Sequence, residues 1–478
     1  MNKWNSLAFS NPHKTPLNTV QKLSLGSALL GVFILLVAWF GITFKNKTLF
    51  LSLSFLLIFV GSIVYTRATY LKHPSKSKNN GVWFNTLSNR GVIGWALAVL
   101  LTLFYVLLYW YPKYLGLSLD ESPNTGLIAL FDPLSEFFKN KPANQWFVYG
   151  TLYTLAILTL GVKFMYKYRD NKHQLIRTSV VIASQLFLAY LIPEILEGLH
   201  AELPYFSKDI KNMWPLNYYF FESWHLNNMM HSGSLGMFYL VTGIFMFAIF
   251  TPIITYFTGK RWYCSWVCGC GGLAETAGDS FRQLSSKKIS AWKLERWSIH
   301  SVMLFIFIVT SVVLYGYFTG KGEVFGLDIY TYFSKPYGFL IGAMFSGVIG
   351  VGFYPLLGSR VWCRFGCPLA GYMGIIQRFK SRFRITTNGG QCISCGNCST
   401  YCEQGIDVRA YAQKGKNIVR ASCVGCGICS DVCPRGVLKL ENGFEKGRIN
   451  ATEILLGNNV DLIKLVNETH NKSNYTRL

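Results

Sequence analysis

The chain has 478 residues, of which 51% are hydrophobic, 16% aromatic and only 14% charged. Soluble domains carry about 25% charged residues, so this composition excludes an ordinary soluble protein. The formal net charge of +23 is compatible with nucleic-acid binding. The Lys and Arg residues, however, are concentrated in alternate segments between the apolar stretches. We therefore expect no nucleic-acid partner, and we assign the excess charge to membrane orientation and to contact with anionic lipid.

Eight apolar stretches are long enough, or nearly so, to cross a bilayer core of about 30 Å. They cover residues 23–43, 48–66, 91–112, 146–166, 178–193, 235–257, 299–317 and 337–357. The fifth is short and carries Ser184 and Gln185. The first 22 residues are polar and show no pattern of a cleavable signal peptide. These features predict a mainly α-helical membrane protein with about eight transmembrane helices.

The distribution of Lys and Arg predicts the orientation of these helices. If the N-terminus is cytoplasmic, the inner segments before the C-terminal region hold 19 Lys and Arg residues, whereas the outer loops hold nine. Segments that remain in the cytoplasm are enriched in these residues. Eight crossings return the chain to the starting side. We therefore expect a multi-pass protein of the bacterial inner membrane with both termini in the cytoplasm.

Two copies of the pattern C-x2-C-x2-C-x3-C lie near the C-terminus, and Pro434 follows the second copy. This spacing is typical of bacterial ferredoxins with two [4Fe–4S] clusters, in which the fourth Cys of each run ligates the other cluster. Thiolates are needed because soft sulfur ligands are selected by iron–sulfur clusters. The expected ligands are Cys392, Cys395, Cys398 and Cys433 for the first cluster, and Cys423, Cys426, Cys429 and Cys402 for the second.

Zinc and disulfides are the alternatives for these eight cysteines. A zinc ribbon uses two separate CxxC pairs, unlike four Cys residues in one short run. Disulfides need an oxidising compartment, which the expected cytoplasmic location does not provide. Glu403 stands where the first run would usually have Pro. We expect this departure to alter the potential or the exposure of one cluster, and to leave the number of ligands unchanged.

The sequence thus predicts three parts. Residues 1–378 form a polytopic transmembrane domain, and residues 379–445 form a small α+β ferredoxin domain with two [4Fe–4S] clusters. Residues 446–478 form a polar tail without recognisable chemistry.

A second cysteine pattern occurs twice inside the predicted membrane domain. Residues 259–268 read Gly-Lys-Arg-Trp-Tyr-Cys-Ser-Trp-Val-Cys, and residues 358–367 read Gly-Ser-Arg-Val-Trp-Cys-Arg-Phe-Gly-Cys. Each follows an apolar stretch that runs from the outer to the inner side. We interpret about 235–270 and 337–370 as parts of a tandem repeat of hairpins. Repeated transmembrane units commonly place a functional site at the repeat interface.

A Cys-x3-Cys spacing places two thiols on one face of a helical turn, and two such turns that face each other form a four-thiolate cage. We expect these thiols to bind a metal centre or to take part in redox chemistry; the alternative is that they are small buried core residues. Cys270 is a fifth thiol, and its role stays open. Arg261 and Arg360 are interpreted either as lipid anchors or as partners of thiolate charge. The four candidate thiols are Cys264, Cys268, Cys363 and Cys367.

The predicted outer loop 194–234 gathers acidic residues and three of the eight His residues of the chain. If its first part is helical, Glu197 and His200 are neighbours on one face and are candidates to accept protons from a quinol. His225 and His231 flank two Met residues and are candidates to bind copper or another metal. A solvated surface is the alternative. The sequence has no C-x-x-C-H motif for covalent haem and no dinucleotide fingerprint.

A polytopic membrane protein with two Cys-x3-Cys motifs, the second followed by Pro368, and with a two-cluster ferredoxin resembles the NapH/NosR/CcoG group. The resemblance covers about residues 235–440. It implies an oxidoreductase of the quinol dehydrogenase type that transfers electrons between the quinone pool, or a cytoplasmic redox protein, and a periplasmic acceptor. An alternative implied by the same group is an assembly factor that reduces copper or another metal during maturation of a respiratory enzyme. The chain departs from the group at Gly269, which replaces the first proline.

Overall fold

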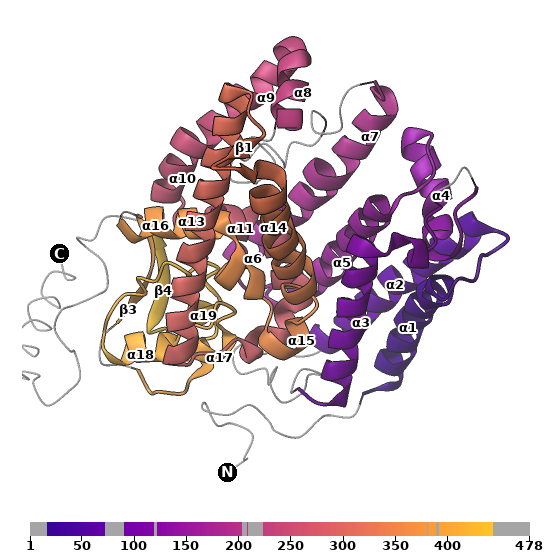
Figure 1. Ribbon diagram of the computed structural model, residues 1–478. Coiled ribbons are helices and arrows are strands. Elements are labelled where there is room, and N and C mark those ends of the chain that lie inside the picture. The colour runs from indigo at the N-terminus through magenta and orange to yellow at the C-terminus, as the bar shows by residue number, and fades with distance from the viewer. Residues whose placement is uncertain are drawn as a thin grey trace, which may run out of the picture.

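The computed structural model describes residues 17–71, 90–118, 122–202, 208, 223–379, 381–388 and 392–442. Within these residues the protein is mainly helical. Long helices run side by side, and a small unit of short helices and two strands lies at one end of them (Figure 1). The predicted polar tail 446–478 and residues 203–207 and 209–222 of the predicted outer loop lie outside the described residues.

Seven helical elements of the described chain are long and apolar enough to cross a membrane. Between 11% and 44% of the residues in their most apolar windows are buried within the protein, so most of their apolar surface faces outward, as expected for contact with lipid. The elements are α1 (Thr19–Trp39), α2 (Lys47–Tyr70), α3 (Val92–Trp110), α5 (Gln145–Lys167), the continuous run of α6 (Lys172–Ala183) and α7 (Ile192–Leu199), the run of α9 (Gly233–Phe245) and α10 (Thr251–Phe257), and α13 (Ile289–Thr319).

The eighth predicted span differs from the other seven. Instead of one α-helix over 337–357, π-helical turns and α14 (Lys335–Tyr337) form an irregular helical run over 330–349, and α15 (Tyr354–Leu357) follows after a turn. A Cβ atom on Gly347 would lie 2.7 Å from the rings of Tyr105 and Tyr109, so this run packs closely against α3. In the part of the chain that the structure describes, seven helices are therefore long and apolar enough to cross a membrane, and this irregular run stands where the eighth was expected.

Successive spans alternate in direction, and this places the start of α1 at the same end as the C-terminal unit (Figure 1). Near the start of α1, Gln21 donates a hydrogen bond of 3.0 Å to Thr69 at the end of α2. Arg169, which follows α5, donates a hydrogen bond of 2.6 Å to the carbonyl of Tyr70. At the start of α6, Gln174 donates to a backbone carbonyl of the C-terminal unit.

Two features at this end exceed the sequence-based expectations. The fifth span was expected over 178–193, but the run of α6 and α7 has 28 residues, because it begins at Lys172, where Asn171 caps the helix, and continues to Leu199. α13 has 31 residues, which corresponds to about 46 Å at 1.5 Å per residue. Since a bilayer core is about 30 Å thick, α13 extends beyond it, and Glu295 on this extension pairs with Arg364 at 2.7 Å.

The shorter elements gather at the two ends of the long helices (Figure 1). At the end remote from the C-terminal unit lie α4 (Gly126–Lys139), α8 (Ser223–His231) and the hairpin of β1 (Glu323–Val324) and β2 (Leu327–Asp328). At the other end lie α11 (Trp262–Trp266), α12 (Gly269–Thr276), the 3₁₀ segment Ala277–Leu284, α15 and α16 (Pro368–Phe379).

The C-terminal unit is an α+β arrangement. Its strands β3 (Phe383–Thr387) and β4 (Leu438–Asn442) pair antiparallel, with Ile385 opposite Leu440. Buried Ile and Leu side chains and the cysteines form its core. The unit also contains α17 (Asn397–Tyr401), α18 (Val408–Gln413) and α19 (Ile428–Asp431).

Two glycines allow α1 and α2 to pack closely. A Cβ atom on Gly31 would lie 2.7 Å from the carbonyl oxygen of Ser54, and one on Gly61 would lie 2.7 Å from the carbonyl oxygen of Ser24. Small residues at such contacts let the backbones of membrane helices approach each other.

Replacing Gly61 with Val is expected to destabilise the protein by about 1–3 kcal/mol, because the added atoms overpack the contact between α1 and α2. The check is the thermal unfolding midpoint in detergent, followed by circular dichroism. Gly26→Val is the matched control, since a Cβ atom on Gly26 has no neighbour within 4 Å. Equal midpoints for the two variants would show that the close contact contributes nothing to stability.

Candidate iron–sulfur site

The two Cys-x3-Cys motifs have matching backbone structures. In the first motif Cys264 lies in α11 and Cys268 is the N-cap of α12. In the second motif Cys363 lies in a π-helical turn and Cys367 immediately precedes α16. The second Cys of each motif has extended backbone angles, with ψ of 126° in the first and 116° in the second. The expectation that each pair lies on one face of a helical turn is therefore wrong, because the chain leaves the turn before the second Cys.

Matching hydrogen bonds hold these two turns. The amide of Cys268 donates to the carbonyl of Tyr263 at 2.8 Å, and the amide of Cys367 donates to the carbonyl of Trp362 at 3.0 Å. Both bonds span five residues, so the two copies of the sequence pattern fold into two copies of one local structure.

The arginine of each motif donates a hydrogen bond to the other motif. Arg261 of the first motif donates to the carbonyl of Cys363 in the second at 2.7 Å, and Arg360 of the second donates to the carbonyl of Cys264 in the first at 3.2 Å. The two arginines are buried, with exposed fractions of 2% and 1%. Their interpretation as lipid anchors is wrong, because both guanidinium groups are used to join the motifs face to face.

The glycine run after the first motif is explained by close packing. Gly269 occupies the first helical position of α12, as Pro368 does in α16, where proline is tolerated because no amide partner is lost. A Cβ atom on Gly269 would lie 2.6 Å from the side-chain oxygen of Gln185, and one on Gly271 would lie 1.9 Å from the carbonyl oxygen of Cys264. Larger residues therefore do not fit here without movement of α11 or of the α6–α7 run.

The four candidate thiols lie close enough to influence one another's ionisation. Burial raises the pKa of Cys264, and the neighbouring thiols Cys363, Cys367 and Cys268 raise it further. A hydrogen bond from Cys270 lowers the pKa of Cys268 to about 6. The motif cysteines are thus gathered in one buried place beside two guanidinium groups, which is favourable for holding an anionic centre.

The C-terminal cysteines separate into two groups that do not follow their order in the sequence. One pocket is lined by Cys392, Cys395, Cys398 and Cys433. The other group consists of Cys423, Cys426, Cys429 and Cys402, which interact electrostatically with one another. This grouping has the crossed pattern expected for a two-cluster ferredoxin, and the assignment of each thiol to a cluster stays a prediction.

The donor set in each group fits an iron–sulfur cluster. Gly396 and Gly427 lie at equivalent positions of the two runs and have φ of 79° and 77°, which lets the backbone turn around a ligand. Burial raises the pKa of Cys398 and of Cys426 to about 12. Since bound metal requires thiolate, iron binding at these positions is coupled to release of the thiol protons.

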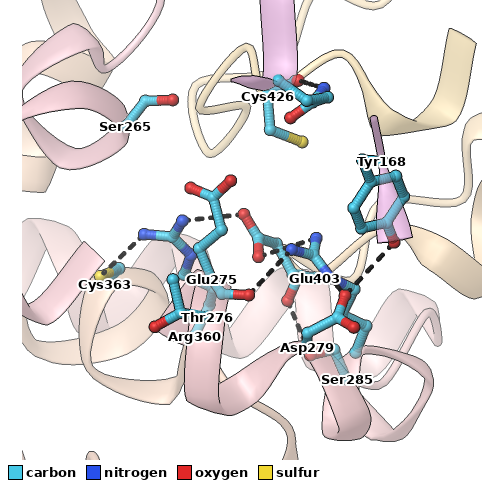
Figure 2. A network of polar contacts seen from close by, with 12 residues as sticks. Tyr168, Ser265, Glu275, Thr276, Asp279, Ser285, Arg360, Cys363, Glu403 and Cys426 are labelled. Atoms are coloured by element: carbon cyan, nitrogen blue, oxygen red, sulfur yellow. Dashed lines mark hydrogen bonds and ion pairs between the residues drawn. The ribbon is translucent and has the colours of Figure 1, made fainter. Parts of the chain in front are cut away.

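Glu403, at the position where proline was expected, is buried with an exposed fraction of 1%. Its carboxylate lies 2.9 Å from Arg360 and 3.0 Å from Arg282. Burial opposes ionisation, but these two cations outweigh it and hold the pKa of Glu403 below its usual value. Arg360 reaches Glu403 on one side and the sulfur of Cys363 on the other, at 3.9 Å (Figure 2). The residue after Cys402 is therefore connected to the second Cys-x3-Cys motif.

The buried polar network extends from Arg282 toward the end of α5. Asp279 lies 2.7 Å from Arg282 and 2.6 Å from Lys167. The hydroxyl of Tyr168 donates a hydrogen bond to Asp279 at 3.3 Å (Figure 2). Burial opposes ionisation of Asp279, but Lys167 and Arg282 outweigh it and hold its pKa well below the usual value. Five ionised side chains thus lie together in a buried interface, where removing one member of an ion pair would leave an uncompensated charge. They are Lys167, Asp279, Arg282, Arg360 and Glu403.

A second connection runs through α6. Gln174 donates to the carbonyl of Cys426 and accepts from Arg177 at 2.5 Å. Arg177 pairs with Glu275 and donates to the hydroxyl of Ser265, the residue after Cys264, at 3.2 Å. This chain of contacts joins the Cys426 loop to the first Cys-x3-Cys motif, as Glu403 joins the Cys402 loop to the second.

This buried network was not predicted from the sequence. A signal was present: Glu275 and Asp279 are acidic residues one helical turn apart in an inner segment where basic residues dominate, and they follow the first motif closely. Arg282 is a local partner of Asp279, but Arg177, which pairs with Glu275, and Lys167, which pairs with Asp279, come from distant parts of the chain, and no local pattern predicts these two pairings.

The candidate quinol residues do not form the expected pair. α7 ends at Leu199, so His200 leaves the helix, and its Nδ1 atom lies 3.3 Å from Glu202. Glu197 is engaged by Lys141 at 3.0 Å and by Lys208. The expectation that Glu197 and His200 are neighbours on one helix face is wrong, because the helix ends before the second residue.

The candidate metal residues of the same outer end also point apart. His225 is buried and His231 is exposed, and their six-residue separation on α8 turns their side chains roughly a third of a turn from each other. Nδ1 of His231 lies 2.7 Å from the carbonyl of Asn227. Among the described residues, no three His, Cys, Asp or Glu side chains are arranged around a single metal ion.

Comparison with known protein families agrees with the cysteine patterns. A 4Fe-4S dicluster domain matches residues 391–438, and a 4Fe-4S binding domain matches twice, at residues 240–291 and 339–386. Each of the last two segments contains one Cys-x3-Cys motif. No solved structure matches the chain.

Two curated relatives match part of the chain. "Putative electron transport protein YccM" of Escherichia coli (strain K12) is 26% identical over 161 residues, which cover 31% of this chain and 43% of that protein. "Regulatory protein NosR" of Stutzerimonas stutzeri is 27% identical over 181 residues, which cover 36% of this chain and 23% of that protein. The chain therefore spans less than half the length of either relative.

The spans, the cysteine groups and these matches define a multi-pass membrane protein that carries 4Fe–4S clusters. More narrowly, over the matched segments the chain is similar to the NosR/NapH-like membrane ferredoxin-type proteins.

Proposed function

We propose that this protein transfers electrons between its C-terminal ferredoxin domain, on the cytoplasmic side, and a quinone of the membrane or an acceptor on the outer side. In this proposal, the electrons pass through the paired Cys-x3-Cys motifs. Bound [4Fe–4S] clusters supply one-electron transfer at potentials that the surrounding hydrogen bonds and burial adjust. The observation that carries the proposal is Arg360, which contacts both Glu403 in the ferredoxin domain and Cys363 in the membrane domain.

We further propose that the paired motifs hold a cluster of their own. Its ligands would be Cys264, Cys268, Cys363 and Cys367. The match of a 4Fe-4S binding domain to both segments supports this assignment, as does the burial of Cys264 and Cys363 beside the two buried arginines. The roles of this chain's residues follow from the contacts: the arginines fix the motifs face to face and offset the negative charge of thiolates, and the packed aromatic and apolar side chains around them exclude water.

A row of aromatic rings offers a packed route from this centre toward the outer end. Cys270 lies beside Tyr153, whose ring centroid is 5.3 Å from that of Tyr149. Tyr149 is 5.9 Å from Tyr105, which is 6.3 Å from Tyr109. The next ring is Trp146, at 5.5 Å from Tyr109 and at the outer start of α5. Continuous packing of this kind avoids gaps that would interrupt electron tunnelling between the two ends.

The orientation rests on two observations that agree. The start of α1 and the ferredoxin domain share one end of the molecule, and the inner segments at this end hold most of the Lys and Arg residues of the loops. Positive loops stay in the cytoplasm. We therefore propose that the N-terminal end of α1 and the ferredoxin domain are both cytoplasmic.

Sealed liposomes containing the protein test the proposed function. Ferricyanide is trapped inside, dithionite is added outside under anaerobic conditions, and the loss of ferricyanide absorbance is followed with and without menaquinone in the bilayer. We expect reduction well above that in empty liposomes, and a Cys363→Ser/Cys367→Ser variant is expected to reduce it to the empty-liposome rate. A wild-type rate equal to that of empty liposomes contradicts transmembrane transfer. Copper(II) trapped in place of ferricyanide tests the alternative of metal reduction.

A further inference from the structure

The two cysteine groups of the ferredoxin domain have opposite environments. A Cβ atom on Gly427, beside Cys426, would meet Leu440 at 2.8 Å and Gln174 of the membrane domain at 3.6 Å. A Cβ atom on Gly396, at the equivalent position of the first run, would meet nothing within 4 Å. The Cys426 group is therefore covered by the membrane domain, whereas the group of Cys392, Cys395, Cys398 and Cys433 faces outward.

The cover of the inner group is made by the same contacts that join the domains. Cys426 packs with Trp262 and Cys264 of the first motif, and its carbonyl accepts from Gln174. The outer group has instead an exposed apolar side chain at its rim, Ile393, with an exposed fraction of 39%. Of the two cysteine groups of the ferredoxin domain, the outer group, formed by Cys392, Cys395, Cys398 and Cys433, is thus the one that a soluble redox partner reaches first.

The charges around the outer group have one sign. Arg409 and Arg435 are exposed and line the pocket formed by its cysteines. Within 381–388 and 392–442, every exposed charged side chain is basic, while the four acidic side chains there are buried or half-buried. The exposed basic residues are Arg409, Lys414, Lys416, Arg435 and Lys439.

The part of this basic face that borders α18 lies away from the membrane-spanning part of the long helices (Figure 1). α18, which begins one residue before Arg409 and ends one residue before Lys414, lies at the outer end of the ferredoxin domain, beyond β3 and β4 (Figure 1). Lipid headgroups at the ends of the long helices are therefore not its natural contact. A small apolar centre within a charged rim is the usual form of a transient docking site, and long-range attraction between opposite charges raises association rates 10- to about 1,000-fold.

We propose that this face, made by Ile393 with Arg409 and Arg435 at its rim, docks an acidic, soluble one-electron carrier protein. The proposal rests on the proposed electron-transfer function and names its cytoplasmic partner by charge and redox class. In the docked complex, the reduced carrier would lose one electron, and the [4Fe–4S] cluster that Cys392, Cys395, Cys398 and Cys433 would hold supplies the one-electron acceptor.

Stopped-flow mixing of the detergent-solubilised protein with a reduced acidic flavodoxin tests the proposal. We expect the second-order rate of flavodoxin oxidation to fall steeply with added salt, because the attraction is screened. An Arg409→Gln/Arg435→Gln variant is expected to react at least about tenfold more slowly at low salt, given the size of electrostatic steering. The matched control is Lys321→Gln/Lys335→Gln, which removes two exposed cations at the opposite end of the molecule.

Reduction by dithionite is measured in parallel. It is expected to reach the same extent in all forms, which shows that the clusters are intact and separates a docking defect from loss of iron. A rate independent of salt, or an equal loss in the two double variants, overturns the docking proposal. Failure of the liposome assay with a normal flavodoxin reaction would instead contradict transmembrane transfer and leave the docking face in place.

Discussion

Anaerobically purified protein with the Cys363→Ser/Cys367→Ser change is expected to contain about four fewer irons per chain than the wild type. The change removes two of the four proposed thiol ligands. Serine hydroxyl groups do not replace thiolates, because iron–sulfur clusters select soft sulfur ligands. We expect about twelve irons in the wild type, for three [4Fe–4S] clusters, and about eight in the variant. Iron and acid-labile sulfide analysis, with EPR of the reduced forms, provides the measurement.

Cys270→Ser is the matched control, because it removes a half-buried thiol from the same region and leaves all four cysteines of the two Cys-x3-Cys pairs in place. It is expected to keep the wild-type iron content. Loss of iron in this variant as well would make Cys270 part of the centre. About eight irons in both the wild type and the Cys363→Ser/Cys367→Ser variant would show that the motif cysteines are structural or act as thiols.

The elements that sequence predicted well are those whose information is local. Apolar stretches gave the positions of the long helices, since length and hydropathy alone are sufficient for a membrane span. The exceptions have specific causes. α13 extends ten residues before its apolar part because charged residues such as Glu295 find buried partners there. The eighth span is irregular, and its glycines, such as Gly347, pack it against the tyrosines of α3.

The candidate site was predictable as a set of cysteines and not as a structure. The matched motifs indicated that two chain segments face each other, but only the fold shows that Arg261 and Arg360 exchange partners between them. The Glu197–His200 pair failed for a local reason, because the last turn of α7 ends one residue too early. Glu403 was visible as a departure from the ferredoxin pattern, yet its partners lie 43 and 121 positions away in the sequence.

Glu403 is expected to be the residue whose removal most weakens the attachment of the ferredoxin domain. The Glu403→Ala change leaves the guanidinium groups of Arg360 and Arg282 without this partner in a buried site. Breaking a buried ion pair from one side destabilises a protein by about 3–5 kcal/mol. We expect a correspondingly lower thermal midpoint in detergent, and faster proteolytic release of the ferredoxin domain. Glu323→Gln, at an exposed position of the opposite end, is the control and is expected to change stability by less than about 0.5 kcal/mol.

A double-mutant cycle separates the contact between Glu403 and Arg360 from the general effect of altering a buried residue. The variants are Glu403→Gln, Arg360→Gln and the combination, all of which preserve side-chain size better than alanine. Because the two groups are in direct contact at 2.9 Å, the double variant is expected to be more stable than the sum of the single losses predicts, with a coupling energy of about 0.5–3 kcal/mol. The EPR signal and midpoint potential of the clusters are recorded for each variant that retains iron. A coupling energy of zero together with unchanged potentials would show that Glu403 fills space at the interface and does not act through Arg360.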